Sequence, residues 1–148
     1  MTSSKRAPLP LIGWREWVGL PDLGIERVKA KIDTGARSSA LYAFDIEYLE
    51  EQDRQMVQFK VHPLQTQTTD ALTVKAELRE KRHVKNSGGT TELRPVILTR
   101  VSLRENEWPI EITLTHRHNM QFRMLFGREA IRNRFLVDTG RSYLQSKK

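Results

Sequence analysis

The 148-residue sequence has no cysteine, few aromatic residues and no long apolar run. Without cysteine, the chain forms no disulfide bond, no thiolate metal site and no cysteine nucleophile, a composition typical of a reducing compartment. No apolar stretch approaches the ~20 residues of a membrane-spanning helix, and the basic beginning of the chain lacks the apolar segment of a secretory signal. These absences predict a cytoplasmic protein with no membrane partner.

Basic residues are in excess, and they are unevenly distributed along the chain. There are 25 Lys and Arg residues against 18 Asp and Glu residues, which gives a formal net charge of +7. Residues 75–104 carry +5 and residues 117–148 carry +6, whereas residues 45–74 carry −4. Because the basic residues are interleaved with apolar ones, we expect this charge to lie on ordered elements and to attract anionic partners.

Alternation between apolar and polar residues is the dominant pattern, and it predicts half-buried β-strands. Turn-forming residues separate the alternating segments, among them Asp53 and the glycine hairpin Asn86–Gly89. Only residues 128–134 indicate a helix. We therefore predict an all-β domain over residues 11–148 with one short C-terminal helix, after a flexible tail at residues 1–10. The alternating segments are 57–61, 72–78, 97–103 and 110–114.

One predicted strand, Val28 to Ile32, leads directly into Asp33-Thr34-Gly35-Ala36. A carboxylate at the end of a strand can face a cleft, the threonine hydroxyl can brace the loop, and Gly35 allows the backbone to approach the carboxylate closely. Ala36 is small enough to leave the cleft open. Asp, Thr and Gly also favour ordinary turns, so the tripeptide by itself leaves a simple turn as the alternative.

A second segment, Met124 to Ile131, is an apolar strand that ends at Gly127 and leads into the short helix. The order of Asp-Thr-Gly-Ala, a glycine hairpin and an apolar-apolar-Gly-Arg segment resembles the catalytic loop, flap and closing strand of retropepsins. More closely, the chain resembles a small bacterial retropepsin-like family found beside RimK-type ATP-grasp ligases, which add glutamates to ribosomal protein tails. That family is also labelled ATP-dependent zinc protease, or RimK/LysX family. The resemblance rests on residues 13–18, 29–40, 84–96, 108–115 and 122–144.

The resemblance implies an acid-protease barrel and an aspartic endopeptidase that needs no cofactor. In this chemistry two carboxylates share one proton and hold a water molecule; one accepts a proton as the water attacks, and the other donates to the carbonyl oxygen. One chain supplies one such loop, formed by Asp33, Thr34 and Gly35. The resemblance therefore implies a homodimer in which the two Asp33 side chains face each other across a two-fold axis.

The resemblance also implies an acidic peptide or a glutamate-tailed protein as substrate, with an ATP-grasp ligase system or the ribosome as further partners. The two basic segments surround the expected flap and closing strand, which favours the same class of substrate. Arg37 binds a substrate carboxylate or pairs with a surface carboxylate, and the glycine hairpin is a flap tip or an ordinary turn. The candidate substrate-binding residues are Ala36, Arg37, Lys85, Asn86, Ser87, Gly88, Gly89 and Arg94.

A second Asp-Thr-Gly, at residues 138–140, is a rival for the other catalytic carboxylate. Only eight residues follow Gly140, too few for a second flap and a second closing strand. This end of the chain resembles the C-terminal strand of that family, and Arg141 to Leu144 would complete the strand here. We therefore expect Asp138 to take no part in catalysis.

The zinc label of the family finds little support in the residues. His62, His83, His116 and His118 are scattered, no HExxH helix is present, and cysteine is absent. His116 and His118 share a strand-to-turn segment, but a spacing of two is common by chance. Tyr42 stands where the family often has a histidine. We therefore assign no metal ligand.

A non-catalytic binding module for an acidic protein or RNA is the alternative function, because the same basic surface would serve it and a fold does not fix a function. Few exposed aromatic residues are expected on the basic strands, so the stacking surfaces of single-strand RNA binders are not predicted. An acidic peptide is therefore favoured over RNA. Replacement of Asp33 by Asn separates the two classes, since an enzyme would lose turnover and a binding module would keep its function.

Overall fold

The computed structural model describes residues 8–62, 71–86, 88–116 and 122–147. Ser87, His118 and residues 1–7 of the predicted tail lie outside this part of the chain. None of the helices in the described ranges is long and apolar enough to cross a membrane.

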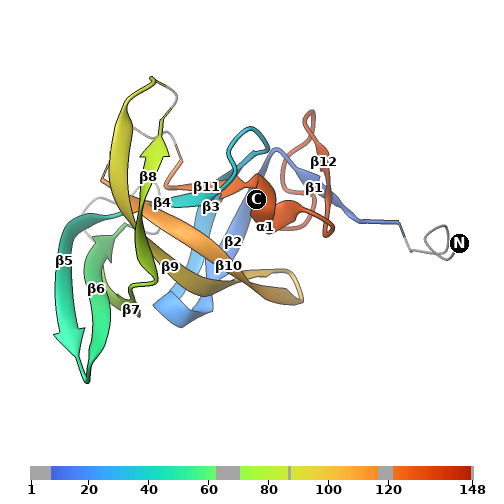
Figure 1. Ribbon diagram of the computed structural model, residues 1–148. Helices are drawn as coiled ribbons and strands as arrows, with labels where there is room; N and C mark the ends of the chain where they lie inside the picture. The colour runs from blue at the N-terminus through green and yellow to red at the C-terminus, as the bar shows by residue number, and fades with distance from the viewer. Residues whose placement is uncertain (1–7, 63–70, 87, 117–121, 148) are drawn as a thin grey trace, which may run out of the picture.

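The main sheet is a barrel (Figure 1). Its strands follow the order β10-β4-β11-β3-β2-β9-β8, and β9 also pairs with β10, so the sheet closes on itself and β8 extends it along one side of β9. This arrangement confirms the predicted all-β fold. The strands are β2 (Arg15–Leu20), β3 (Ile25–Asp33), β4 (Ser39–Tyr42), β8 (Glu80–Lys85), β9 (Thr91–Leu103), β10 (Asn106–Thr115) and β11 (Met124–Gly127).

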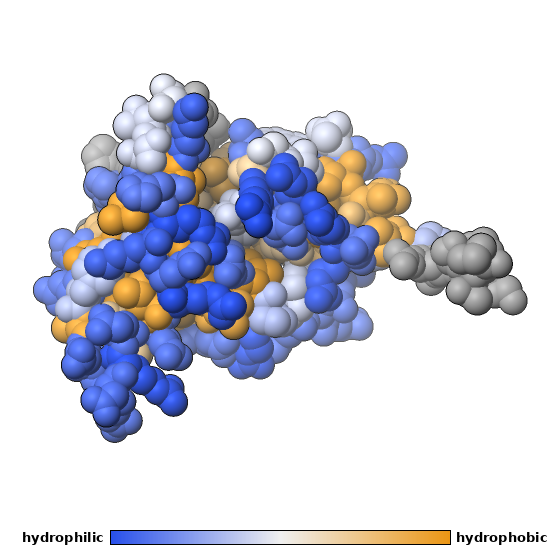
Figure 2. All heavy atoms as spheres, in the orientation of Figure 1, coloured by the Kyte–Doolittle hydropathy of each residue, from blue (hydrophilic) through white to orange (hydrophobic). Residues whose placement is uncertain are grey.

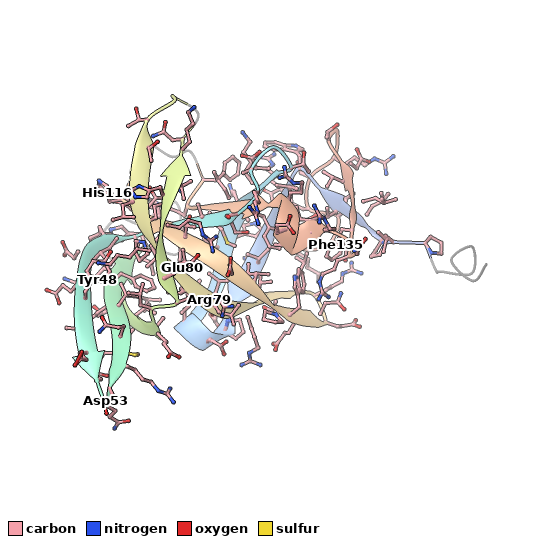
Figure 3. The ribbon with its side chains drawn as sticks, in the orientation of Figure 1. Tyr48, Asp53, Arg79, Glu80, His116 and Phe135 are labelled. Atoms are coloured by element: carbon pink, nitrogen blue, oxygen red, sulfur yellow. The ribbon has the colours of Figure 1, made fainter. Side chains whose placement is uncertain are left out.

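Two smaller sheets lie at opposite ends of the molecule (Figure 1). One consists of β1 (Leu11–Gly13) and β12 (Leu136–Asp138), which pair in parallel. The other is the antiparallel sheet of β5 (Phe44–Glu51), β6 (Arg54–Val61) and β7 (Leu72–Glu77), and Asp53 lies at the tip of its β5–β6 hairpin (Figure 3). The helical elements are the 3-10 turn η2 (Pro21–Leu23) and α1 (Arg128–Ile131).

The core follows the alternation seen in the sequence. Val57, Phe59 and Val61 of β6 are all buried, as are Ile110 and Ile112 of β10. Polar residues cover most of the face shown in Figure 2, with apolar residues exposed between them. The four predicted alternating segments thus fall within β6, β7, β9 and β10, although β7 ends one residue short of the predicted segment.

Two predictions for the C-terminal region need correction. The helix expected at residues 128–134 ends at Ile131, because Arg132 has an extended ψ of 131° and Asn133 has a positive φ of 65°, neither of which a continued helix allows. The strand expected at residues 141–144 does not form; β12 ends at Asp138, and Tyr143 has a φ of 57° that interrupts extended backbone.

Glu16 holds the C-terminal segment against the barrel instead. Its carboxylate is fully buried and accepts hydrogen bonds from the backbone N–H groups of Gly13 (2.7 Å), Leu144 (2.9 Å) and Gln145 (3.1 Å) and from the Ser146 hydroxyl (2.7 Å). Hydrogen bonds to a buried carboxylate are stronger than neutral ones, and they offset the cost of its desolvation. We call this arrangement the Glu16 clasp.

Candidate active site

The loop after Asp33 is positioned by the strand and helix that follow it much later in the chain. Strand β11 lies between β3 and β4, and Gly127 at its end is in register with Asp33. The next two backbone N–H groups, of Arg128 and Glu129, donate to the carbonyl oxygens of Ala36 (2.7 Å) and Arg37 (3.1 Å). The beginning of α1 therefore fixes the course of the loop.

Gly127 has no room for a side chain. A Cβ atom at this position would lie 2.5 Å from the carbonyl carbon and oxygen of Ser38, closer than real contacts allow. Its N–H donates to the Ser39 hydroxyl oxygen at 3.0 Å. Close packing of the loop on β11 is thus the physical reason for glycine at the end of the apolar strand.

Asp33 is half-buried, and one of its carboxylate oxygens is held by its own loop. The Gly35 N–H donates to Asp33 Oδ1 at 3.1 Å, and the Ala36 N–H donates to the Asp33 carbonyl at 3.2 Å. Within the described ranges, Oδ2 has no hydrogen bond or ion pair. Thr34 braces the loop through its carbonyl, which accepts from Arg128 Nη1 at 3.1 Å. The carboxylate is oriented and keeps one oxygen available.

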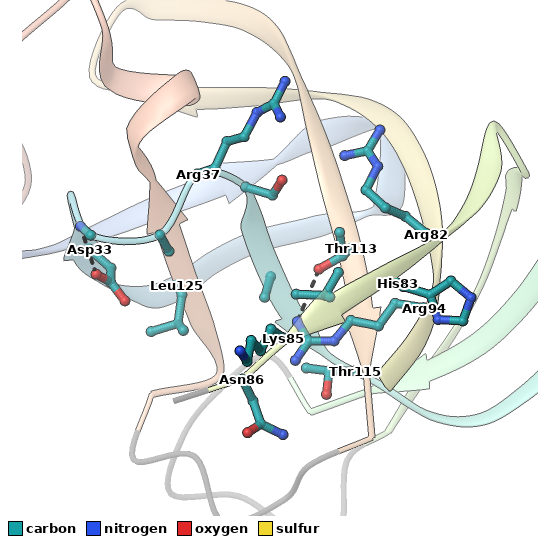
Figure 4. Close-up of a pocket in the computed structure, with 15 residues that line it drawn as sticks. Asp33, Arg37, Arg82, His83, Lys85, Asn86, Arg94, Thr113, Thr115 and Leu125 are labelled. Carbon is teal, nitrogen blue, oxygen red and sulfur yellow. Dashed lines mark hydrogen bonds between the residues drawn. The ribbon is translucent and has the colours of Figure 1, made fainter. Parts of the chain in front are cut away.

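Asp33 lines a cleft of about 660 Å³ between its own loop and the β8–β9 hairpin (Figure 4). We call this the Asp33 cleft. Of the residues singled out from the sequence, Thr34, Gly88 and Gly89 do not line it, and Ser87 is outside the described ranges. The others line the same cleft: Asp33, Gly35, Ala36, Arg37, Lys85, Asn86 and Arg94.

The cations of the Asp33 cleft fall into two groups. Arg94 is buried; its Nε contacts Glu92 Oε1 at 3.0 Å and its Nη1 donates to the Thr113 hydroxyl oxygen at 3.3 Å. The side chains of Arg37 and Lys85 are exposed and have no hydrogen bond or ion pair within the described part of the chain. Arg37 and Lys85 are therefore the cations that can meet a ligand without first losing a partner.

Arg82 is a cleft residue that the sequence analysis missed. Hydrogen bonds to Glu80, above all, and to Glu111 raise the pKa of its guanidinium, so its charge is already compensated. Strand β8 was not predicted, because successive charged residues at its beginning hide any apolar alternation. Leu125 was also missed. Alternation along β11 could have indicated it, because Leu125 lies between buried Met124 and Phe126 and therefore points to the opposite face of the strand. The missed lining residues are Ser38, Ala40, Arg82, His83, Val84, Thr113, Thr115 and Leu125.

The glycine hairpin at the end of β8 is a tight turn that stands out from the barrel (Figure 1). Asn86 Oδ1 accepts from the N–H groups of Gly88 (2.9 Å) and Thr90 (3.2 Å), and Gly89 has a φ of 85°. Asn86 itself lines the Asp33 cleft. The hairpin thus borders the cleft at its base, while its two glycines lie beyond the lining.

The histidines of the described ranges are dispersed. His62 stacks on Phe44 with ring centroids 4.8 Å apart, His83 lines the Asp33 cleft, and His116 Nδ1 lies 3.1 Å from Glu92 Oε2. Among the residues that the structure describes, no three His, Asp or Glu side chains are grouped so as to hold a metal ion.

Asp138 lies outside the Asp33 cleft, on the β1–β12 sheet. Its Oδ1 accepts from the Gly140 N–H at 2.9 Å, and its Oδ2 lies 3.5 Å from Arg141 Nε. Its carboxylate therefore already has a cationic partner.

Known proteins are similar to this chain in sequence and in fold. A protein named probable alpha-L-glutamate ligase from Parasynechococcus marenigrum is 43% identical over 128 residues, and one of the same name from Shewanella pealeana is 38% identical over 138 residues. These matches cover 86% and 93% of this chain but only 28% and 30% of the relatives, so the chain spans less than a third of their length.

The crystal structure of a protein of unknown function from Legionella pneumophila is similar, with a TM-score of 0.77 and 28% identity, over 92% of this chain and 98% of that one. Residues 11–148 match the sequence model of a family described as RimB-like, retropepsin-like aspartic endopeptidase RimB. The whole barrel, with the Asp33 loop and strand β11, falls within that match. The chain therefore belongs to the RimB-like family of retropepsin-like proteins.

Proposed function

We propose that this protein is an aspartic endopeptidase, and that Asp33 from each of two copies forms its catalytic pair. The observation that carries the proposal is the placement of Asp33 in the cleft, with Oδ1 held by the Gly35 N–H and Oδ2 without a partner in the described ranges. A carboxylate fixed through one oxygen presents the other to a water molecule or to a second carboxylate.

In the proposed pair, the two Asp33 side chains share one proton. Two carboxylates about 3 Å apart do not ionise independently, so the pair titrates as a unit. The ionised partner accepts a proton from the bound water as the water oxygen attacks the peptide carbonyl, and the protonated partner donates its proton to the carbonyl oxygen. As the tetrahedral intermediate breaks down, the carboxyl that took the proton from water gives it to the leaving amine, and the other carboxylate accepts a proton from a hydroxyl group of the intermediate, which restores the shared proton.

The proposed homodimer supplies the second Asp33, and the β1–β12 sheet is our candidate for its contact surface. Leu11 and Leu136 lie opposite each other in this sheet and are 44% and 54% exposed. The sheet is tied to the site, because the Ile32 N–H donates to the carbonyl of Trp14 (2.8 Å), the residue directly after β1. Exposed apolar side chains that a symmetric partner covers are typical of homodimer interfaces.

We propose an acidic or glutamate-tailed peptide as substrate. Among the described residues, Arg37 and Lys85 are the cations of the Asp33 cleft without a partner, and they outnumber its single carboxylate, Asp33; an excess of positive charge in a cleft concentrates anionic ligands. The relatives named probable alpha-L-glutamate ligases support a glutamate-containing substrate, because each combines a segment similar to this chain with a much longer remainder in one polypeptide. A glutamate ligase is accordingly the partner we propose, together with the ribosome as a source of tailed substrates.

Cleavage assays with matched peptides test this function. A peptide with a glutamate tail and a neutral peptide of the same length are incubated with the protein across a salt series. We expect faster cleavage of the acidic peptide, with a difference that shrinks as salt screens the exposed cations. Binding of the acidic peptide without any cleavage would refute the peptidase and favour a non-catalytic binding module. Equal cleavage rates of the two peptides would refute the electrostatic argument for an acidic substrate.

A further inference from the structure

A second cleft, of about 450 Å³, adjoins the Asp33 cleft. The two share Arg37, Ser38 and Arg82, but Asp33 lines only the first. In the close-up of Figure 4, the side chains of Arg37 and Arg82 extend to the same side. The second cleft therefore lies beyond these two arginines as seen from Asp33, and we call it the distal cleft.

Strand β10 forms a floor that both clefts share. Thr115 and Thr113 line the Asp33 cleft, and Glu111 and Pro109 line the distal cleft. Alternate residues of a strand point to the same face, so these four side chains form one row. At a rise of ~3.4 Å per residue, the row from Thr115 to Pro109 extends about 20 Å, the length of about six residues of an extended peptide.

The acidic residues of the distal cleft are compensated by neighbouring arginines. Glu111 contacts Arg79 and Arg82, each at 3.1 Å, and Glu129 contacts Arg132 at 3.2 Å. Figure 3 shows Arg79 beside Glu80, at the beginning of β8. These pairs leave the distal cleft without an uncompensated acidic group among the residues described, so a cationic ligand gains little there.

Leu98 and Pro109 give the distal cleft an exposed apolar surface, and Ser38 and Ser39 belong to its uncharged polar lining. Leu98 is 52% exposed, because it lies on the face of β9 opposite to that of its buried neighbours Ile97 and Thr99. Pro109 is exposed and lines the distal cleft together with Leu98, whereas Ile110 and Ala130 line this cleft but are buried. An apolar ligand group that covers this surface is stabilised by the release of water from it.

We propose that the distal cleft is a specificity site, which binds one apolar side chain of the substrate several residues away from the scissile bond. Arg37, at the junction of the two clefts, would bind a substrate carboxylate between that apolar residue and Asp33. The proposal rests on the proposed function and deepens it. Its preferred substrate is an acidic peptide that contains one apolar residue, rather than a uniformly acidic one.

Leu93 provides a matched control for Leu98. Both leucines belong to β9 and both are 52% exposed, but Leu93 lines neither cleft. Because both side chains are exposed, neither replacement by serine removes a core residue, and thermal unfolding of each variant verifies that the barrel is intact.

Peptide binding and peptide cleavage are measured separately. A ten-residue, fluorescently labelled glutamate peptide is prepared with one leucine or one serine, and this residue is moved along the peptide one position at a time. Binding is measured by fluorescence anisotropy on the Asp33→Asn protein, alone and combined with Leu98→Ser or Leu93→Ser. Cleavage is measured on the wild-type protein and on the Leu98→Ser and Leu93→Ser variants, all of which retain Asp33.

We expect leucine at one or two adjacent positions to give about tenfold tighter binding than serine. Leu98→Ser should abolish this preference, and Leu93→Ser should retain it. Equal binding of all peptides, or equal effects of the two leucine variants, would overturn the distal cleft proposal even if the protein cleaves acidic peptides. A preference that Leu98→Ser abolishes, without cleavage by any variant, would support the distal cleft and refute the peptidase.

Discussion

The two Asp-Thr-Gly tripeptides of this chain adopt the same local turn in different surroundings. In each, the glycine N–H donates to Oδ1 of the aspartate, at 3.1 Å for Asp33 and 2.9 Å for Asp138. The loop after Asp33 is held by the beginning of α1 and lines a cleft, whereas Asp138 pairs with Arg141 on a small sheet outside it. The tripeptide sequence thus specifies only a local turn. The packing of the distant Gly127 segment against the first tripeptide is what makes that one a candidate site.

The largest expected difference between the two loops is in catalysis. Asp33→Asn preserves size but removes the shared proton, so we expect cleavage of a glutamate-tailed peptide to fall at least about 1,000-fold. Asp138→Asn removes only the ion pair between half-buried Asp138 and exposed Arg141, outside the Asp33 cleft, and we expect its activity to stay within about twofold of the wild type. Steady-state cleavage rates of both variants check this prediction. A larger loss in Asp138→Asn than in Asp33→Asn would show that the Asp138 loop, and not the Asp33 loop, carries catalysis.

The next difference concerns the two glycines that accompany these loops. Gly127→Ala places a Cβ atom 2.5 Å from the Ser38 backbone, and we expect it to lower the free energy of unfolding by about 2–3 kcal/mol. At Gly140 a Cβ atom would meet only Asp138 Oδ1, at 3.6 Å, so Gly140→Ala should change stability by no more than about 0.5 kcal/mol. Urea unfolding measures both, and equal losses would show that close packing does not distinguish the two regions.

A smaller effect is expected from the Glu16 clasp, which holds the segment that follows Asp138. Glu16→Gln replaces one acceptor oxygen with an NH₂ group that faces backbone donors, and we expect it to lower the free energy of unfolding by about 1–2 kcal/mol. Exposed Glu26 is the control, since Glu26→Gln removes no hydrogen bond within the described ranges. Limited proteolysis should cut Glu16→Gln first after Arg141 or Lys147; cleavage patterns identical to the control would refute the clasp.

The sequence allowed the barrel to be predicted better than its site. Alternation places Val57 and Ile112 correctly in the core, and the Asp33 loop leads to the cleft. Arg94 and Lys85 are alike as cations in the sequence, and only the folded chain shows that Arg94 is buried beside Glu92. The Glu16 clasp could not be predicted either, because the partners that it holds in the C-terminal segment are about 130 residues away and no motif marks Glu16.

The central claim is that the catalytic pair comes from two chains and not from Asp33 and Asp138 of one. The most direct test mixes a fixed amount of wild-type protein with increasing amounts of Asp33→Asn protein and allows the subunits to exchange. If both copies supply Asp33, mixed dimers are inactive, so an equal amount of variant should reduce the activity to about half and a ninefold excess to about one tenth. Activity that stays constant across the series would contradict the claim.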